Sequence, residues 1–246
     1  MSVRIGILYP GHAAEHDYEL LTERLGGRCT FEVVHTSIGE DAHRIDALLD
    51  MGRPERLLEG ARRWRGPVAA AMWACTSGSF VYGLDGARRQ AQDLAAALGV
   101  PASSTSLAFL SALRALGVQR VAIAATYPAA VTERFRDFLG AAGVKPVLVA
   151  SHGIVTAAEV GALGRDSALE LAAAADHPDT EAVLVPDTAL HSIGLLGELE
   201  DTARKPVLTA NQVSAWEALR LSGLSITATG LGRLFEEGAN RLTPPR

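Results

Sequence analysis

Cysteine is scarce in this chain of 246 residues, where only Cys29 and Cys75 carry a thiol. There is no CxxC pair and no cysteine–histidine spacing of the kind that binds structural zinc. This scarcity excludes a disulfide framework and a zinc module, and it fits the reducing conditions of the cytoplasm. Apolar residues make up 48% of the chain, which is ample for a packed core and argues against a disordered or fibrous protein.

Long apolar runs and blocks of positive charge are also missing. No apolar stretch approaches the ~18–20 residues of a membrane-spanning helix, and the first residues lack the charged and apolar regions of a secretion signal. Acidic residues outnumber basic ones by 28 to 23, for a net charge of −5, and no basic stripe studded with aromatic residues indicates nucleic-acid binding. We therefore expect a soluble cytoplasmic protein with neither a membrane nor a nucleic-acid partner.

Familiar catalytic and nucleotide-binding motifs are absent as well. The sequence contains no GxGxxG, no Walker-type GxxxxGKS/T, no GxSxG elbow and no HExxH, so it gives no local support for nucleotide binding or metalloprotease chemistry. The seven histidines are scattered. His12, which follows the first predicted strand, and His191, four residues after Asp187, could each line a crevice, although a lone histidine is more often a surface or capping residue.

Short apolar segments do alternate with helical segments along the whole chain. Strands are predicted over residues 4–9, 30–35, 68–73, 120–125, 145–149 and 181–186. Helices are predicted over residues 18–25, 54–64, 88–98, 131–142, 166–175 and 213–221, together with a helix capped by 104–106 that ends at Leu116, and a last one after Gly230. Asn211 is predicted to open the helix 213–221. The alternation predicts an α/β fold, with mainly parallel sheets covered by helices on both faces.

Cys75 stands just after the predicted strand 68–73 and is followed by the hydroxyl-rich loop 76–79. The carboxyl end of a parallel strand is where open α/β sheets bind their ligands. The hydroxyl and backbone N–H groups of such a loop suit a carboxylate or another oxyanion. We interpret Cys75 as a functional thiol. The alternative is a small buried hydrophobic residue, which most free cysteines are.

The second half of the chain repeats this arrangement. The predicted strand 181–186 is followed by Asp187 and Thr188, just as the earlier strand is followed by Cys75 and Thr76. We interpret the two halves as copies of one α/β unit related by a pseudo-two-fold axis, with chance similarity of Ala- and Leu-rich segments as the alternative. Two such copies would bring Cys75 and Asp187 to face each other across a cleft.

The same interpretation divides the chain into two lobes. The helix endings Ala112-Leu113-Arg114 and Ala218-Leu219-Arg220 recur 106 residues apart, each after a proline-initiated segment. No Pro/Ser-rich linker separates the halves, so we expect one intimately packed unit over residues 1–246. Its approximate lobes are residues 1–105 with the C-terminal segment 213–246, and residues 106–212.

Three segments resemble a known family: Cys-Thr-Ser-Gly-Ser at 75–79, LGVQRVA at 116–122 and ANQVSAWEALRLSG at 210–223. They are similar to maleate isomerases and arylmalonate decarboxylases, two branches of the aspartate/glutamate/hydantoin racemase superfamily. The similarity runs from about residue 4 to about residue 223. It implies two pseudo-symmetric Rossmann-like lobes, chemistry without a cofactor, one catalytic position from each lobe, a small carboxylate or dicarboxylate substrate and a homo-oligomer such as a dimer.

The resemblance also implies roles for individual residues. Cys75 matches the catalytic cysteine of the first lobe in isomerases and racemases, a position that is glycine in the decarboxylase. Thr76 and Ser77 match residues that hold a substrate carboxylate. Tyr127 matches a carboxylate-binding tyrosine, and Thr188 would extend the anion pocket from the second lobe.

The chain departs from the family pattern at two places. Asp187 stands where both branches usually carry the second catalytic cysteine, which argues against racemisation by two symmetric thiols. Ala13 and Ala157 fall where maleate isomerases have substrate-gripping asparagines, which argues against maleate itself. We still expect Cys75 and Asp187 to be the catalytic pair, with His12 as a further substrate contact.

One thiol and an anion pocket are compatible with several reactions. Addition of the Cys75 thiolate to a cis-enedioate, rotation and expulsion would give the trans isomer. As an acid, the thiol could protonate the enediolate that remains after a substrate loses carbon dioxide. In a racemase, Cys75 and Asp187 on opposite faces of the substrate could remove and return the proton alpha to a carboxylate. Because Cys75 is retained, we place isomerase or racemase chemistry first, decarboxylation second and a non-catalytic carboxylate-binding protein third.

Overall fold

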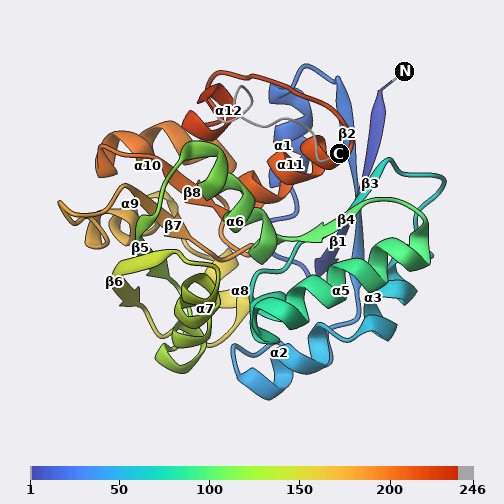
Figure 1. The fold of residues 1–246 in the computed structure, drawn as a ribbon, viewed down its shortest axis with the longest axis horizontal. Coiled ribbons are helices and arrows are strands. Elements are labelled where there is room, and N and C mark those ends of the chain that lie inside the picture. Colours follow the sequence, from blue (N-terminus) through green and yellow to red (C-terminus); the bar gives the residue numbers. More distant parts are fainter. Residues whose placement is uncertain (1, 238–246) are drawn as a thin grey trace.

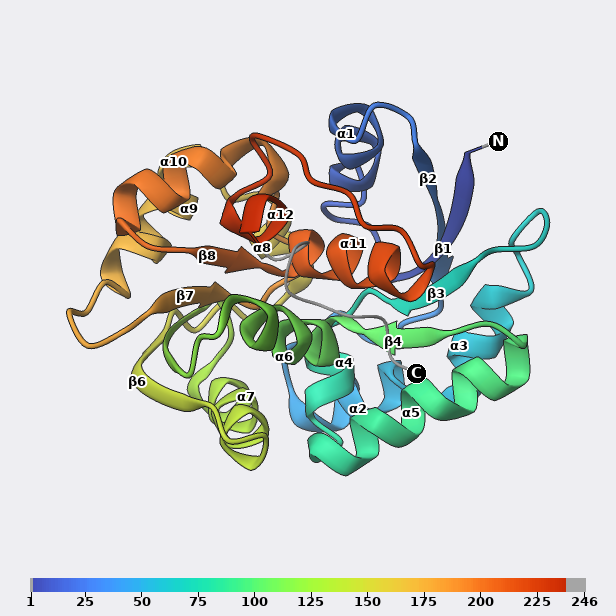
Figure 2. The same ribbon diagram turned by 45° about the horizontal axis from the view of Figure 1, so that its top comes forward.

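The computed structural model describes residues 2–237, and its first four strands form one parallel sheet. The strands pair in the order β2-β1-β3-β4. Their bounds are β1 (Val3–Pro10), β2 (Cys29–Thr36), β3 (Ala70–Trp73) and β4 (Ala102–Ser104). Figure 2 shows this sheet in one half of the molecule, beside a second sheet in the other half.

The second sheet repeats the topology of the first. It is also parallel, with the order β6-β5-β7-β8. Its strands are β5 (Arg120–Ala125), β6 (Lys145–Ser151), β7 (Ala182–Val185) and β8 (Val207–Thr209). The strands β3 and β7, which lead to Cys75 and Asp187, hold equivalent inner positions and are buried along their whole length. The predicted α/β fold with two similar parallel sheets is confirmed.

Helices cover both faces of the sheets (Figure 1). They are α1 (Asp17–Arg24), α2 (Ile45–Met51), α3 (Pro54–Ala61), α4 (Ser77–Phe80), α5 (Gly83–Leu98), α6 (Thr105–Leu116), α7 (Ala129–Ala141), α8 (Ala157–Gly161), α9 (Arg165–Ala174), α10 (Leu196–Ala203), α11 (Ala210–Leu221) and α12 (Arg233–Glu237), with a 3₁₀ turn at Ile193–Leu195. Within residues 2–237, no helix combines the length and the apolar character needed to cross a bilayer.

The N-termini of α6 and α11 are capped by polar side chains, one as predicted and one not. Ser104 caps α6 as predicted, because its hydroxyl accepts a hydrogen bond from the Leu107 amide. The prediction that Asn211 opens the next equivalent helix is wrong. Thr209 is the N-cap of α11 and forms a capping box with Gln212, so the helix begins before Asn211. The amide of Asn211 is therefore free to bond elsewhere, and it does so across the lobes.

Other boundaries differ where local signals were weak. The helix predicted to run to Trp64 ends at Ala61. The last helix begins at Arg233, and its expected continuation past residue 237 lies outside the described residues. The short helices α2, α8 and α10 were not predicted, since segments of five to eight residues give too little periodicity to stand out.

The two sheets share one interior. The main hydrophobic core combines buried residues of both sheets, including Ile5 and Ile7 from β1 and Ile123 from β5. Helix α11 packs against β3 and β4 of the first sheet as well as against β8. Helix α11 therefore contacts both sheets, and the expected lobe boundaries stay a prediction.

Buried hydrogen bonds tie the end of β1 to the loop after β7. The Tyr9 hydroxyl donates to the Thr188 carbonyl at 2.7 Å and accepts from the Ala14 amide at 3.0 Å. Asp17, at the start of α1, accepts from the Ser192 amide and from the Asn211 side chain, both at 3.0 Å. These bonds fix how the two strand ends with Cys75 and Asp187 approach each other.

Candidate active site

Cys75 and Asp187 line one pocket, and both are almost fully buried, with 3% and 4% of their surfaces exposed. Each follows the carboxyl end of its inner strand, β3 or β7, where parallel sheets open toward ligands. Other residues of the wall come from the loop after β1, from α2 and the segment before it, and from α8. The lining residues are Tyr9, Pro10, Gly11, His12, Ala13, Ile38, Asp41, His43, Leu48, Met51, Cys75, Ser77, Ala157, Asp187, Thr188 and Ala189.

The Cys75 sulfur is held by the start of the loop that follows it. The Gly78 amide donates to Sγ at 3.2 Å, and the Ser77 hydroxyl and the Met51 sulfur lie 3.8 and 3.9 Å away. A Cβ at Gly78 would come within 3.0 Å of Sγ, so this close approach requires glycine. Burial raises the pKa of the thiol to about 11; the carboxylate of Asp187 adds to the rise, and the Gly78 N–H opposes it. Near neutral pH, Cys75 is therefore a protonated thiol and a proton donor.

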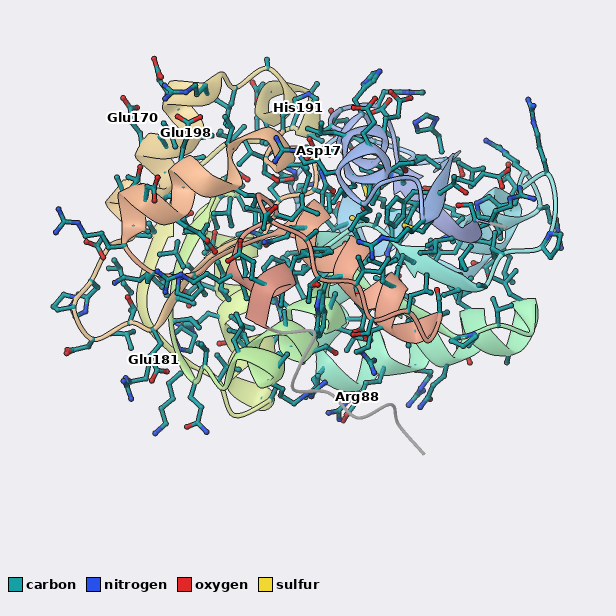
Figure 3. All side chains as sticks on the ribbon, turned by 90° about the horizontal axis from the view of Figure 1, so that it is seen from above. Asp17, Arg88, Glu170, Glu181, His191 and Glu198 are labelled. Carbon is teal, nitrogen blue, oxygen red and sulfur yellow. The ribbon has the colours of Figure 1, made fainter. Side chains whose placement is uncertain are left out.

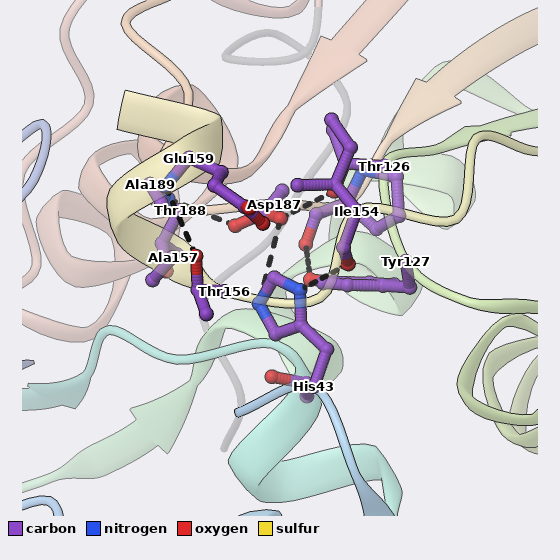
Figure 4. Close-up of polar contacts among 12 residues, drawn as sticks. His43, Thr126, Tyr127, Ile154, Thr156, Ala157, Glu159, Asp187, Thr188 and Ala189 are labelled. Atoms are coloured by element: carbon purple, nitrogen blue, oxygen red, sulfur yellow. Dashed lines mark hydrogen bonds and ion pairs between the residues drawn. The ribbon is translucent and has the colours of Figure 1, made fainter. Parts of the chain in front are cut away.

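The Asp187 carboxylate is held in place on both of its oxygens. Oδ1 accepts from the Ala189 amide at 3.0 Å, and Oδ2 accepts from the Thr126 hydroxyl (Figure 4). Nε2 of His43 lies 3.9 Å from Oδ2. Asp187 is thus fixed by its own lobe and faces a histidine of the other lobe.

His43 was not among the residues predicted for the site. Its backbone amide donates to the Val155 carbonyl at 2.7 Å, and its Nδ1 lies 2.9 Å from the Ile154 carbonyl oxygen. Because a carbonyl oxygen only accepts, Nδ1 carries a hydrogen, which leaves Nε2 as the atom that faces Asp187. The ring also packs edge-on against Tyr127, with centroids 4.9 Å apart. Nothing in the irregular segment around His43 distinguishes it from the other histidines in the sequence.

Of the predicted carboxylate-binding residues, Ser77 and Thr188 line the pocket, whereas Thr76 and Tyr127 lie behind its wall. The Tyr127 hydroxyl donates to the Pro186 carbonyl at 2.7 Å, and burial raises its pKa well above the usual value. The Thr76 hydroxyl is buried and has no partner in hydrogen-bonding geometry within residues 2–237. Because Thr76 and Tyr127 do not line the pocket, they support its wall and do not face it directly.

The two histidines considered in the sequence analysis, His12 and His191, lie in different places. His12 lines the pocket from its rim, with 73% of its side chain exposed. His191 is not in the pocket and lies beside Asp17 instead, with Nδ1 4.0 Å from Oδ1 (Figure 3). Ala13 and Ala157 both line the pocket, so their small side chains are part of its wall.

Comparison with known proteins connects this site to a family. The model of the arylmalonate decarboxylase family matches residues 54–235. The chain belongs to the arylmalonate decarboxylase family. An arylmalonate decarboxylase from Bordetella bronchiseptica is 32% identical over 126 residues, which cover 50% of this chain and 52% of that protein. The match thus spans about half the length of that curated relative.

Solved structures of the arylmalonate decarboxylase family share the fold over nearly the whole chain. A liganded arylmalonate decarboxylase with a glycine-to-cysteine and a cysteine-to-serine substitution is 28% identical, with a TM-score of 0.85, covering 96% of this chain and 100% of that one. The maleate isomerase of Pseudomonas putida S16 has a TM-score of 0.86 at 23% identity, covering 97% and 100% of the two chains. The predicted resemblance to the decarboxylase and isomerase branch is confirmed, and the fold is that of enzymes.

Proposed function

We propose that the protein is a cofactor-independent decarboxylase that acts on a small substituted malonate, with Cys75 as the proton donor. The observation that carries this proposal is the buried thiol, which lines a pocket together with the apolar side chains of Ile38, Leu48 and Met51. These apolar side chains suit an organic substituent, while Ser77 and Thr188 offer hydrogen bonds to one carboxylate.

The reaction begins with loss of carbon dioxide from the second carboxylate. The carbon–carbon bond breaks, and its electron pair passes into an enediolate whose oxygens accept hydrogen bonds from the pocket-lining Ser77 and Thr188. The Cys75 S–H bond then gives its proton to the former alpha carbon, and the sulfur becomes a thiolate. The net change converts one malonate dianion and one proton into a monocarboxylate and carbon dioxide.

The pair of His43 and Asp187 supplies the next proton in this scheme. Asp187 accepts two hydrogen bonds, and its Oδ2 lies 3.9 Å from Nε2 of His43, so a proton taken up from solvent can be held between the two groups. After turnover, that proton can pass to the thiolate of Cys75 directly or through one water molecule. The transfer restores the thiol, and the pair then takes up another proton from solvent before the next turnover.

Two features favour decarboxylation over the isomerisation that the sequence alone places first. A thiol with a raised pKa is a better match to an acid than to a nucleophile, which must be a thiolate. In addition, Asp187 would repel the second carboxylate of a bound enedioate, whereas a malonate loses that carboxylate in the reaction.

Cis–trans isomerisation is the second candidate, because one contact favours it. The Gly78 N–H at 3.2 Å from the sulfur would stabilise a thiolate, which is the form that adds to an alkene. The liganded relative has a glycine replaced by cysteine and a cysteine replaced by serine, so its cysteine content resembles that proposed for this pocket.

A screen in D₂O separates these functions. The protein would be incubated with 2-alkyl and 2-aryl malonates and with maleate, and carbon dioxide and deuterium at the alpha carbon would be measured. We expect one carbon dioxide and one deuterium per malonate turned over, and no product with Cys75→Ser. Conversion of the cis-enedioate without carbon dioxide would replace the proposal by the isomerase. No turnover of any substrate, together with protection of Cys75 from iodoacetamide by a malonate, would identify a binding protein.

A further inference from the structure

A second group of chemically active side chains lies at the rim of the pocket. His12 and Glu15 come from the loop between β1 and α1, and His35 comes from β2. The parallel register pairs Tyr9 with His35, so the end of β2 lies beside the loop that carries the other two residues. We propose that His12, Glu15 and His35 form a binding site for a divalent transition-metal ion of the zinc type.

The distances fit such an ion. Nδ1 of His12 and Nε2 of His35 lie 3.1 and 3.4 Å from the same oxygen, Oε1 of Glu15, and the three ligand atoms all lie within 4.8 Å of one another. Zinc bonds of about 2.0–2.2 Å in a tetrahedral arrangement place neighbouring ligand atoms about 3.3–3.5 Å apart. The imidazole rings of His12 and His35 pack against each other, with centroids 3.7 Å apart, so they must separate to share one ion. The exposed His12 side chain can make this movement, and the fourth position is left for water or another ligand.

The hydrogen bonds around Glu15 and His35 are compatible with metal binding. The other oxygen of Glu15, Oε2, accepts the Ala13 amide at 2.8 Å, which orients the carboxylate as a supporting hydrogen bond does in metal sites. Nε2 of His35 is buried and has no hydrogen-bond partner in the described structure.

The charges around His12, Glu15 and His35 also bear on whether a cation can bind there. The Glu15 carboxylate supplies a negative charge that a cation can neutralise. Arg63 opposes the cation, since it lies near His35 and donates to its carbonyl oxygen at 3.0 Å. The Arg63 side chain is 52% exposed, however, so solvent screens much of its charge. Two nitrogen donors and one oxygen donor also match zinc better than magnesium or calcium, which prefer oxygen alone.

The site is tested by binding and not by turnover, so its failure would be distinct from failure of the proposed decarboxylase. Untagged, chelator-treated protein would be titrated with Zn²⁺ by calorimetry and with Co²⁺ by visible absorption. We expect one ion per chain and the intense visible bands of a low-coordinate Co²⁺ ion. The near-ultraviolet sulfur charge-transfer band should be absent, because neither cysteine belongs to the site.

Substitutions identify the ligands. His12→Ala and Glu15→Gln should each weaken binding at least tenfold, and thermal melts would show that each variant is folded. His16→Ala is the matched control, since this histidine is exposed, adjacent and outside the cluster, and should bind like the wild type. The proposal is overturned if the wild type shows no saturable one-ion binding. It also fails if both ligand variants bind as tightly as the control, or if Cys75→Ser alone abolishes binding.

Discussion

At the scale of single residues, two buried groups determine what the pocket can do: the protonated thiol of Cys75 and the charge of Asp187. The Gly78 amide is positioned to stabilise negative charge on sulfur, while burial and Asp187 work against it. Burial and Asp187 outweigh the Gly78 amide, so the sulfur keeps its proton at neutral pH. In the proposed decarboxylation, this proton would be transferred to the enediolate intermediate.

Substitution of the thiol gives the first prediction. Cys75→Ser should preserve the fold and lower turnover of the malonate identified in the screen by at least about a hundredfold, because a hydroxyl is a much weaker acid than a thiol. Steady-state rates with matched circular dichroism spectra would measure this. Cys29→Ser is the control: Cys29 is also buried, but it lies at the start of β2 and away from the pocket, so its loss should leave turnover unchanged. A larger loss in Cys29→Ser would disprove the assignment.

The coupling of the two groups gives a second prediction, with a defined sign. Asp187 raises the pKa of the Cys75 thiol, so Asp187→Asn should lower that pKa and shift the pH profile of iodoacetamide labelling to lower pH. Like charges at close range change a pKa by about one unit or more. The profile would be measured in a Cys29→Ser background by mass spectrometry, with the exposed Asp46→Asn as control. An unmoved profile in Asp187→Asn would mean that the two residues do not share the pocket.

At the scale of elements, the loops after β7 and β1 are joined by a buried carboxylate. Asp17 Oδ2 accepts from the Ser192 amide, the Ile193 amide and the Asn211 side chain, at 3.0, 3.4 and 3.0 Å. The same Asn211 amide group donates to the Thr188 carbonyl at 3.0 Å, next to Asp187. The carboxylate therefore fixes α1, the 3₁₀ turn and α11 relative to the loop that carries Asp187.

Removal of this carboxylate gives a third prediction. Asp17→Ala would leave several buried donors without a partner, and we expect it to lower the free energy of unfolding by about 2–4 kcal/mol. Asp17→Asn keeps one acceptor oxygen and should cost less. Urea unfolding monitored by tryptophan fluorescence would compare the variants. Equal stability of Asp17→Ala and the wild type would show that the network does not hold the lobes.

The same carboxyl also makes stability depend on pH. Burial raises the pKa of Asp17 in the folded state, despite its hydrogen bonds, so the folded chain keeps a proton that the unfolded chain has already released. The contribution of this group to stability is therefore full below its ordinary pKa and declines as the pH rises through its folded pKa. Asp17→Asn should remove this contribution to the pH dependence of the unfolding free energy. A typical surface aspartate, whose pKa is lowered on folding, contributes with the opposite sign.

At the scale of the whole molecule, the fold could be predicted from the sequence because the same pattern of strands and helices occurs in both halves of the chain. The parallel sheets and the shared pocket of Cys75 and Asp187 follow from repeated apolar segments that end in polar residues, whereas β4 and β8, with three residues each, are too short to be predicted. His43 could not be predicted in this way, because it belongs to an irregular segment whose path is set by hydrogen bonds to Ile154 and Val155 in the other lobe. Contacts between distant loops leave no periodic pattern in a sequence.

The segment that carries His43 also closes the pocket across the lobes, which leads to the last prediction. Asp41, in the first lobe, accepts hydrogen bonds from the Ala157 and Ala158 amides at the start of α8, at 2.8 and 3.1 Å. A carboxylate at a helix N-terminus contributes about 0.5–2 kcal/mol, so Asp41→Ala should destabilise the protein by a similar amount. Because this contact joins the lobes beside the pocket, its loss should also expose Cys75 and speed iodoacetamide labelling at a fixed alkaline pH.

A second variant distinguishes closure from charge in this experiment. Asp41→Asn removes the negative charge as fully as Asp41→Ala does, but it keeps one oxygen that can accept a hydrogen bond from the amides of α8. If Asp41 holds the lobes together, Asp41→Asn should label at a rate between those of the wild type and Asp41→Ala. Equal rates in the two variants would mean that Asp41 acts on the thiol through its charge alone. Wild-type rates and wild-type stability in both would show that the segment around His43 stays in place without this contact.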